Sequence, residues 1–512
     1  MKLSFRLCFP VAGMLILAGC TTLGPEAQTA ALIAQAEAAM GSATLKTLTV
    51  TGRGTGASVG QAHAPGMPWP ALEVRALSRS LNFETAAFRE EFIRSRSEAL
   101  GGGALPAMGS GEARGVVLAR EACAWDVVGV ATVAAPAALP ERLHDLWTST
   151  PQGAVKAAAR QSARAGVRRD FLRRWDTLSF ELPGQFSDTL VFEDTGLISS
   201  IESSVSHALL GQMPVLTRFL DYQPQAGLVL PSRIVQVQGG HAALDLQITH
   251  AAADEAVEIT VPDDVRAATA TGTDGVTVTV DKVADGVWFL AGGTHHSVAI
   301  EQAGQIVLVE APLHAARARA VFDAANKLAA GKQARVVITT HHHFDHVGGL
   351  RAAAATEATL YTSALARPYL EAFISPSSVP PSPARAGDAA APAGLASRFV
   401  AVDGRAVLND AARPIEIHEL QGSPHARGLL VVWLPRERLL IQADAYTPGV
   451  PGVPGVSGSP EPPPPATPDP NSLNLVQNLE RLGLAPRLIL PLHGRVVPAA
   501  DLYAQTGRSA PP

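Results

Sequence analysis

The chain has 512 residues, of which 47% are hydrophobic and 17% are charged. This is the composition of a folded globular protein, and the length predicts two or more domains because a single core does not grow to this size. The formal net charge is −5 and no run of lysine or arginine occurs, so the sequence gives no electrostatic support to a nucleic-acid partner.

The first twenty residues have the layout of a secretory signal. Lys2 and Arg6 are followed by an apolar stretch at residues 11–17, which is too short to span a bilayer as a helix. Leu17-Ala18-Gly19-Cys20 resembles a bacterial lipobox, so residues 1–19 are predicted to be removed and Cys20 to carry lipid. No aspartate follows this cysteine, which by resemblance to Gram-negative lipoproteins predicts an outer-membrane anchor facing the periplasm. The alternative is an uncleaved anchor, or an ordinary signal with a chance cysteine.

After removal of the leader, Cys123 would be the remaining thiol, and no intrachain disulfide is expected. Cys123 lies in an apolar stretch beside Ala124 and Trp125. We predict that it is a packed core residue rather than a nucleophile.

The first domain is predicted at residues 20–265. A helix is expected over about Pro25–Met40, and apolar and polar residues alternate from Thr44, as is typical of a strand. Further strands are predicted at Leu81–Arg94, Gly115–Leu118, Val127–Val133, Asp176–Leu182, Asp188–Glu193, Gly227–Val237 and Ala243–His250, with helices around Pro140–Thr148 and Gly153–Val167. These elements predict an α+β domain of antiparallel sheet with helices, which weakly resembles the curved sheets of periplasmic lipoprotein carriers.

The second domain is predicted at residues 274–505, after a junction at Val261–Thr273. Strands are expected at 276–280, 287–291, 298–301, 305–310, 335–340 and 359–362, and helices at 315–330 and 349–355. Alternating strands and helices indicate βαβ units, whose functional site lies where the strands end. The Pro- and Gly-rich stretches Ile374–Ser397 and Pro448–Pro470 are either surface loops or lids over a substrate.

The sharpest motif in the sequence is His-x-His-x-Asp-His, formed by His341, His343, Asp345 and His346 directly after a predicted strand. Imidazole nitrogens and a carboxylate oxygen are ligands that suit Zn²⁺. The glycines that follow allow the backbone to turn closely beneath the metals and enter the next helix. A metal-binding loop is therefore predicted, rather than a His-rich surface loop.

This motif and its context resemble the metallo-β-lactamase superfamily, from about Asp274 to about Leu502. The resemblance implies an αββα sandwich and further ligands in a fixed order, which His425, Asp444 and His493 match. It implies that the first of two zinc ions takes His341, His343 and His425. The second takes Asp345, His346 and His493, with Asp444 bridging the pair.

One position departs from the family pattern. Glu310 stands where the family usually has an aspartate that supports the ligand loop, and a glutamate can still accept those hydrogen bonds. His342 points away by its spacing and is not expected to be a ligand, and His418 is predicted to be structural.

Two zinc ions would hold a bridging hydroxide that attacks a small-molecule substrate at an ester, lactone, thioester or related bond. Asp345 would orient this nucleophile and pass a proton to the leaving group. Tyr446 is either an oxyanion donor or a packed loop aromatic, and His295 and His296 are weaker candidates for substrate contact.

A true β-lactamase is disfavoured because β-lactam-cleaving members usually lack a carboxylate at the position of Asp444. A redox role is disfavoured because His343 stands where flavodiiron proteins have glutamate. The alternative to a hydrolase is a non-catalytic envelope lipoprotein, which binds a lipid or protein partner and has a structural metal site.

Overall fold

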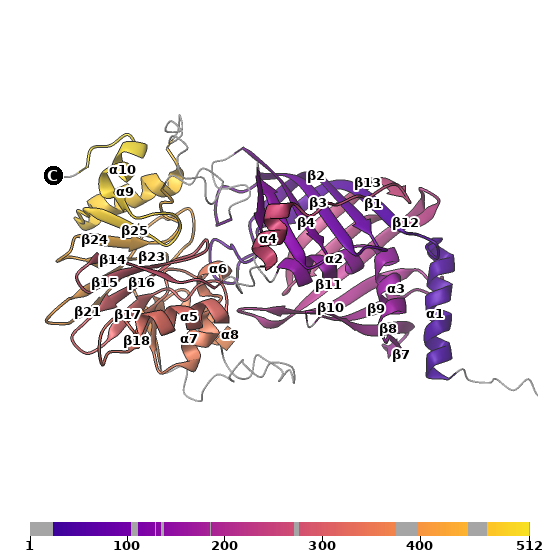
Figure 1. Ribbon diagram of the computed structural model, residues 1–512, viewed down its shortest axis with the longest axis horizontal. Helices are drawn as coiled ribbons and strands as arrows, with labels where there is room; N and C mark the ends of the chain where they lie inside the picture. Colours follow the sequence, from indigo (N-terminus) through magenta and orange to yellow (C-terminus); the bar gives the residue numbers. More distant parts are fainter. Residues whose placement is uncertain are drawn as a thin grey trace, which may run out of the picture.

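The computed structural model describes residues 24–103, 111–128, 130–134, 138–184, 186–270, 276–374, 398–448 and 468–510. They form two units placed end to end, an N-terminal one dominated by a broad sheet and a C-terminal sandwich (Figure 1). The predicted leader, Cys20 and most of the two Pro- and Gly-rich stretches lie outside these residues. Among the described helices, none is long and apolar enough to cross a membrane.

The N-terminal unit is mostly antiparallel sheet. Its thirteen strands follow the order β6-β5-β4-β3-β2-β1-β13-β12-β11-β10-β9-β8-β7, so the first strand lies in the middle and the chain meanders outward and back. The strands are β1 (Thr47–Ala57), β2 (Ala71–Asn82), β3 (Ala87–Arg96), β4 (Glu112–Arg120), β5 (Cys123–Val128), β6 (Val130–Val133), β7 (Arg164–Arg169), β8 (Arg174–Leu182), β9 (Phe186–Phe192), β10 (Ile198–His207), β11 (Gly211–Gln225), β12 (Leu228–Gln238) and β13 (His241–Ala253).

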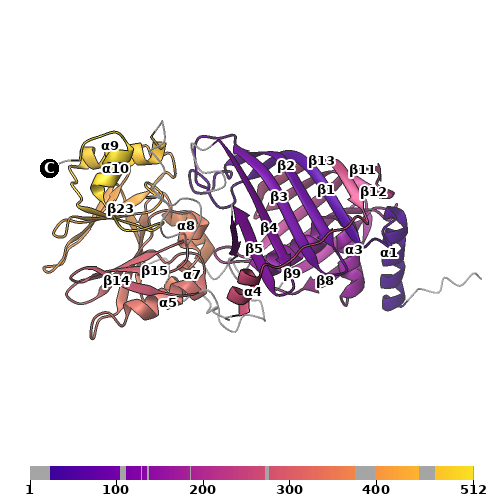
Figure 2. The same cartoon turned by 45° about the horizontal axis from the view of Figure 1, so that its top comes forward.

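Three helices pack against this sheet: α1 (Pro25–Met40), α2 (Ala138–Thr148) and α3 (Pro151–Arg160) (Figure 1). Helix α1 stands across one end of the sheet, next to α3 (Figure 2). The apolar residues of the three helices, such as Met40, Leu146 and Val155, share one core with the inward side chains of the strands. A fourth helix, α4 (Asp263–Ala270), covers β5 and β6 near the junction. Cys123 is buried in the small cluster beneath it, beside Trp125 and Ile259, as predicted.

Several predicted boundaries were wrong. Leu81–Arg94 is not one strand, because residues 83–86 turn between β2 and β3. The predicted helix at 153–167 ends at Arg160, since Gln161 is extended and the following residues pair with β8 as β7. The long strands β10 and β11 were not predicted. The unit is therefore more sheet-rich than the α+β domain expected from the sequence.

The C-terminal unit has two facing sheets with helices on both outer sides. One sheet has the order β14-β15-β16-β17-β18-β19-β20 and the other β21-β22-β23-β24-β25-β26. Their strands are β14 (Thr279–Ala284), β15 (Val287–Ala291), β16 (Ser297–Glu301), β17 (Ile306–Val309), β18 (Ala334–Ile338), β19 (Thr359–Ser363), β20 (Phe399–Val402), β21 (Arg405–Leu408), β22 (Ile415–Glu419), β23 (Leu430–Leu434), β24 (Leu439–Gln442), β25 (Leu488–Pro491) and β26 (Val497–Pro498).

The strand β17 shows why both faces of these sheets are covered. Its four residues are all fully buried; Val307 and Val309 face the core between the sheets, while Ile306 and Leu308 face the core under the helices. The helices are α5 (Ala315–Ala325), α7 (Leu350–Ala355) and α8 (Arg367–Ile374) on the first sheet, and α9 (Pro470–Leu482) and α10 (Ala499–Gln505) on the second. This is the expected αββα sandwich, and β17, β18 and β19 are parallel as βαβ units require.

Candidate metal centre

The His-rich loop leaves the carboxyl end of β18 and enters the short helix α6 (Phe344–Val347). The turn is tight: a Cβ atom at Gly348 would lie 1.9 Å from the carbonyl oxygen of Leu313. Only glycine allows this close approach. The rings of His341 and His346 lie close together after the turn, with their centroids 4.4 Å apart.

The first group of ligand atoms comes from His341, His343, His425 and Asp444. The Nε2 atom of His341 lies 2.9 Å from Nδ1 of His343 and 3.2 Å from Nε2 of His425. The Oδ2 atom of Asp444 lies 3.1 Å from Nε2 of His425 and 3.4 Å from Nε2 of His341. Four ligand atoms from three separate loops therefore surround one point.

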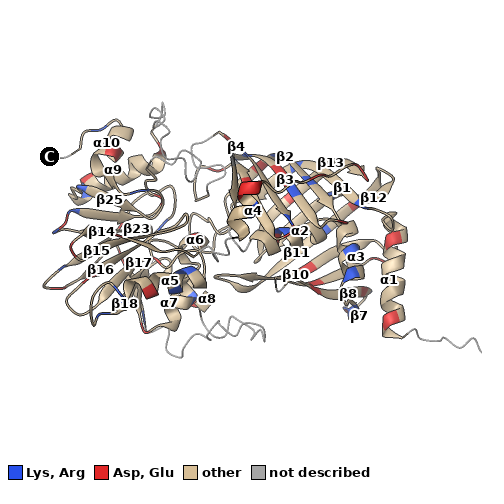
Figure 3. Cartoon of the chain, viewed as in Figure 1, with Lys and Arg blue, Asp and Glu red and all other residues tan. Residues whose placement is uncertain are grey.

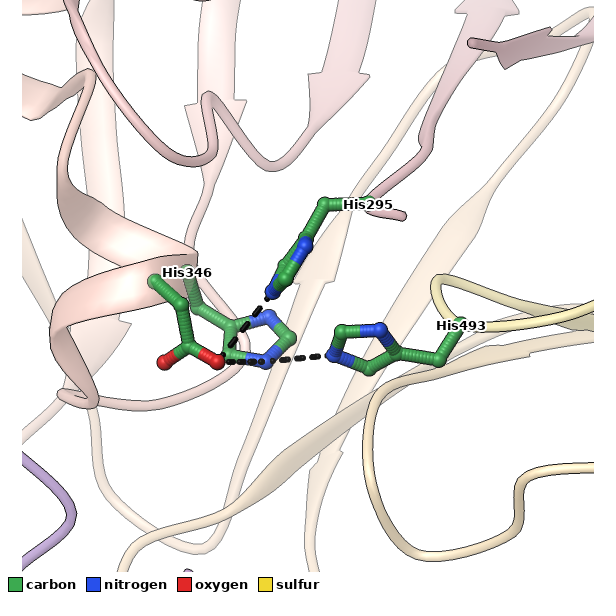
Figure 4. Close-up of side chains that lie close together, drawn as sticks. His295, His346 and His493 are labelled. Atoms are coloured by element: carbon green, nitrogen blue, oxygen red, sulfur yellow. Dashed lines mark hydrogen bonds and ion pairs between the residues drawn. The ribbon is translucent and has the colours of Figure 1, made fainter. Parts of the chain in front are cut away.

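The second group consists of His295, Asp345, His346 and His493. The Nε2 atoms of His493 and His346 lie 3.0 Å apart, and Nε2 of His295 lies 3.1 Å from Oδ2 of Asp345 (Figure 4). Asp444 reaches this group as well, since its Oδ2 is 2.7 Å from His346 Nε2 and its Oδ1 is 3.2 Å from His493 Nε2. Asp444 thus lies between the two groups.

The buried Glu310 lies behind both groups. Its Oε2 accepts a hydrogen bond of 2.8 Å from Nδ1 of His346, and its Oε1 accepts one from the hydroxyl of Thr340. Thr340 Oγ1 in turn lies 2.9 Å from Nδ1 of His341. Glu310 therefore supports His346 directly and His341 through Thr340. This agrees with the prediction that a glutamate at this position can accept the hydrogen bonds that the family's usual aspartate accepts.

The hydrogen bonds behind the rings determine which nitrogens carry protons. A carbonyl oxygen can only accept, so His343 donates from Nε2 to Ala62 O at 2.9 Å, and His493 donates from Nδ1 to Thr294 O at 3.0 Å. Because Thr340 gives its proton to Glu310, its oxygen accepts from Nδ1 of His341. In the neutral rings, His341 Nε2 and His343 Nδ1 therefore face each other as lone pairs at 2.9 Å.

Facing lone pairs repel unless a cation lies between them, so this arrangement fits a bound metal ion. The donor set of imidazoles and carboxylates suits zinc. Each of the two groups offers four ligand atoms within 4.8 Å of one another, and Asp444 contacts both.

The pKa shifts in the site bear on which candidate ligands are deprotonated and so able to bind a cation. Burial, together with the neighbouring imidazoles, lowers the pKa of His341 well below its usual value, so this ring is neutral. Burial alone would raise the pKa of Asp444, but His346, His493 and His425 hold it well below the ordinary range. Burial would also lower the pKa of His346, yet Glu310 and Asp444 outweigh it and raise this pKa well above normal. A cation would take the place of that proton.

The structure brings all seven predicted ligands together but not Tyr446. That side chain is 1% exposed and packs in the core between the second sheet and α9, with Leu475 and Tyr503. Its position corresponds to the packed aromatic rather than to the oxyanion donor. His342 turns away from the ligand groups and contacts Ala62 O, as its spacing predicted.

Sequence reasoning missed or undervalued three residues of the site. His295 was only a weak candidate for substrate contact, but its ring joins the second ligand group. Gln61 and Ala62 belong to the loop between β1 and β2 in the N-terminal unit, far from the motif in sequence. Gln61 Nε2 donates to Oδ1 of Asp345 at 2.9 Å. The doublet His295-His296 was a visible signal, whereas nothing in the sequence singled out Gln61.

Comparisons with known proteins concern the C-terminal unit. A family model described as the metallo-beta-lactamase superfamily matches residues 290–493. A solved metallo-beta-lactamase from Pontibacter korlensis is 16% identical, with 45% of this chain and 97% of that chain covered and a TM-score of 0.32. One from Hirschia baltica is 18% identical, with 45% and 96% covered and a TM-score of 0.32. No curated protein matches the chain significantly.

Proposed function

Residues 290–493 form a metallo-beta-lactamase superfamily domain, and from this premise we propose that the chain is a metal-dependent hydrolase with two zinc ions. The substrate class we propose is a small molecule with an ester, lactone, thioester or related bond. The observation that carries the proposal is the pair of four-atom ligand groups that Asp444 joins.

Bound divalent cations would acidify a water molecule and polarise the bond that it attacks. The protein supplies a carboxylate beside this position: the side chain of Asp345 is 32% exposed, whereas those of His295 and His346 are 10% and 0% exposed. The pKa of Asp345 is held below its usual range, with burial opposed by His346 and His295, so it is ionised at neutral pH. As an ionised carboxylate, Asp345 can accept a hydrogen bond from the attacking water and orient it, and transfer of a proton to the leaving group is the second role that we propose for it.

The orientation of Asp345 is set by two contacts. Gln61 donates to its Oδ1 and His295 lies against its Oδ2. Two contacts on opposite oxygens restrict the carboxylate to one orientation, which favours positioning of the attacking water.

The test is to measure the metal content of the purified full chain and its turnover of chromogenic esters, lactones, thioesters and nitrocefin. We expect two zinc ions per chain and activity on at least one ester-type class. Asp444→Ala should lower the metal content and reduce turnover by about a hundredfold or more, since it removes the carboxylate shared by both groups. Two bound zinc ions without turnover of any compound would instead favour a structural metal site.

We also propose that the chain is an outer-membrane lipoprotein facing the periplasm, anchored through Cys20. The support is the leader and lipobox-like sequence at residues 1–20. Fractionation of cells that produce the chain or its Cys20→Ser variant tests this. The parent should co-sediment with outer membranes, and the variant should lose the lipid mass on its N-terminal peptide.

A further inference from the structure

The loop between β1 and β2, residues 58–70, reaches from the N-terminal sheet to the metal centre. The backbone N–H of Arg427, two residues after the ligand His425, donates to His63 O at 2.7 Å. His63 Nε2 lies 3.0 Å from Ser423 O on the same ligand loop. The ring of Trp69 meets Phe344 edge-on, with the ring centroids 6.2 Å apart. This loop therefore contacts both the His-rich segment and the loop that carries His425.

A second segment of the N-terminal unit, residues 97–103, reinforces this contact. Gly101 N donates to Pro424 O at 2.9 Å, and Gly102 N donates to Gln61 O at 3.0 Å. A Cβ atom at Gly102 would lie 2.7 Å from Cε1 of His343. The backbone is thus packed directly against a metal-ligand ring, with no room for a larger residue.

Two contacts of the β1–β2 loop act on the ligands themselves. Ala62 O accepts the proton of His343 Nε2, which leaves Nδ1 free to face the first cation position. The side-chain amide of Gln61 holds Oδ1 of Asp345 at 2.9 Å, so that Oδ2 is directed to the second group.

We propose that the β1–β2 loop is part of the metal centre and that Gln61 is a positioning residue for Asp345. The N-terminal unit then has a defined role: it completes the support of ligands on the C-terminal sandwich. This inference rests on the proposed function only in requiring that cations bind between the ligand groups.

The test uses the full chain with Gln61→Met, which keeps the length of the side chain but removes the donor, and Gln61→Ala. Zinc affinity is measured by competition with a chromogenic chelator, and cobalt substitution reports ligand geometry by absorption. We expect weaker binding of one of the two cations by about tenfold, a changed cobalt spectrum, and a larger fall in kcat than rise in KM.

Gln236→Ala is the matched control, because Gln236 is also half-buried in the N-terminal unit and bonded to Thr217. It should leave both affinities unchanged. Parental zinc affinity and cobalt spectrum in folded Gln61→Met would overturn the role of Gln61. A parent chain that binds no zinc would instead contradict the proposed function, so the two failures are distinguishable.

A different observation supports a second proposal, at the turn between β7 and β8. Phe171 and Leu172 are 105% and 93% exposed, the highest values among the exposed large hydrophobic residues. The turn is ordered: Asp170 Oδ1 accepts from the N–H groups of Leu172 and Arg173, at 2.9 Å each. Both apolar side chains are therefore presented to solvent by a fixed turn.

The strands that carry this apolar tip are rich in arginine. Residues 164–176 contain five arginines and two aspartates, which gives a formal charge of +3. Arg168 pairs with Glu202 and Arg174 with Asp176, while Trp175 lies half-buried beside them. Figure 3 shows the basic residues at β7, at the end of the sheet where α1 lies. Including Glu202, with its charge of −1, lowers the formal charge of the turn and its partners from +3 to +2. Apolar side chains on an arginine-rich turn match the interface of an anionic lipid bilayer.

The position of the tip is compatible with the proposed lipid anchor. Thr29, in the first turns of α1, accepts from Ala165 N of β7 at 3.0 Å through its hydroxyl. The predicted lipid-bearing Cys20 precedes this helix. Basic residues near such an anchor add electrostatic attraction to an anionic bilayer.

We infer that the β7–β8 tip docks on an anionic lipid surface. The test is flotation of the full chain carrying Cys20→Ser with phosphatidylglycerol or phosphatidylcholine vesicles. We expect preferential binding to the anionic vesicles, weakened by salt, and a loss of about tenfold when Phe171→Ser and Leu172→Ser are added. The control is Leu365→Ser with Val407→Ser, two apolar residues exposed on the other unit. Unchanged flotation of the tip variant, or equal binding to both vesicles, would overturn the inference.

Discussion

Glu310 contacts two neighbouring groups of the metal centre with its two carboxylate oxygens. One oxygen accepts from His346 and the other from Thr340, which orients His341. A glutamine can accept at only one of these positions, because its amide nitrogen has no lone pair to offer. The substitution would also remove the negative charge of Glu310, which stabilises positive charge at the ring of His346.

We predict that Glu310→Gln lowers zinc affinity by about tenfold to a hundredfold, the usual effect of removing a group that orients a metal-binding histidine. Chelator competition measures this. Glu416→Gln is the control, since Glu416 also bonds a histidine, His418, at 2.9 Å, but on β22 and away from the ligand groups. Equal affinities in the two variants would contradict the role of Glu310.

At the scale of elements, a buried polar group joins α2 to the N-terminal sheet. Asp188 on β9 is 1% exposed, and its Oδ1 lies 2.9 Å from Nε2 of His144 on α2. The same oxygen accepts from Ser203 on β10 at 2.5 Å. One buried carboxylate thus connects a helix and two strands.

We predict that Asp188→Ala lowers the free energy of unfolding by about 3–5 kcal/mol, because His144 and Ser203 lose their acceptor inside the core. Urea denaturation followed by circular dichroism measures the change. Asp176→Ala removes a carboxylate from a pair that is exposed on both sides, and it should change stability by less than about 1 kcal/mol. The metal content should stay at the parental level in both variants.

At the scale of the whole molecule, the two units meet at a buried apolar contact. Leu209, from the β10–β11 turn, and Trp69 share a core with the helices of the sandwich. His207 stabilises that turn, because its Nδ1 accepts from the N–H groups of Leu209 and Leu210 at 3.2 and 3.1 Å. Burial and the nearby Arg351 lower the pKa of His207 to about 4.

A lowered histidine pKa stabilises the fold above the unfolded value of about 6.5. The contribution of His207 to the free energy of unfolding is lost as the pH falls from about 6.5 through about 4, because protonation removes the lone pair on Nδ1. We predict that His207→Asn, which keeps an acceptor but cannot be protonated, reduces the loss of stability between pH 6.5 and 4. Denaturation curves at several pH values test this. His250→Asn, an exposed histidine on β13, should keep the parental pH dependence.

The sequence predicted the sandwich and the His-rich loop because these are local signals, whereas His425, Asp444 and His493 were implied by the family resemblance. Continuous apolar strands such as residues 306–309 require cover on both faces, and the spacing of His341, His343, Asp345 and His346 requires one loop after a strand. The place of Asp444, which contacts both ligand groups, was implied by the same resemblance. Boundaries within the N-terminal sheet were less predictable. In β11, for example, Leu216 and Leu220 lie on the face opposite to the buried Val215 and Phe219, which obscures the alternation in the sequence.

Only the tertiary structure decided which parts of the N-terminal unit reach the site. Gln61 and Ala62 carry no signal in sequence, since a glutamine in a polar loop and a backbone carbonyl acquire a role only from what packs against them. The same holds for Tyr446, which lies two residues after a ligand but turns into the outer core. The candidate metal ligands can be predicted from the sequence because they depend on side-chain chemistry. The residues that orient those ligands depend on which surfaces meet when the two units pack.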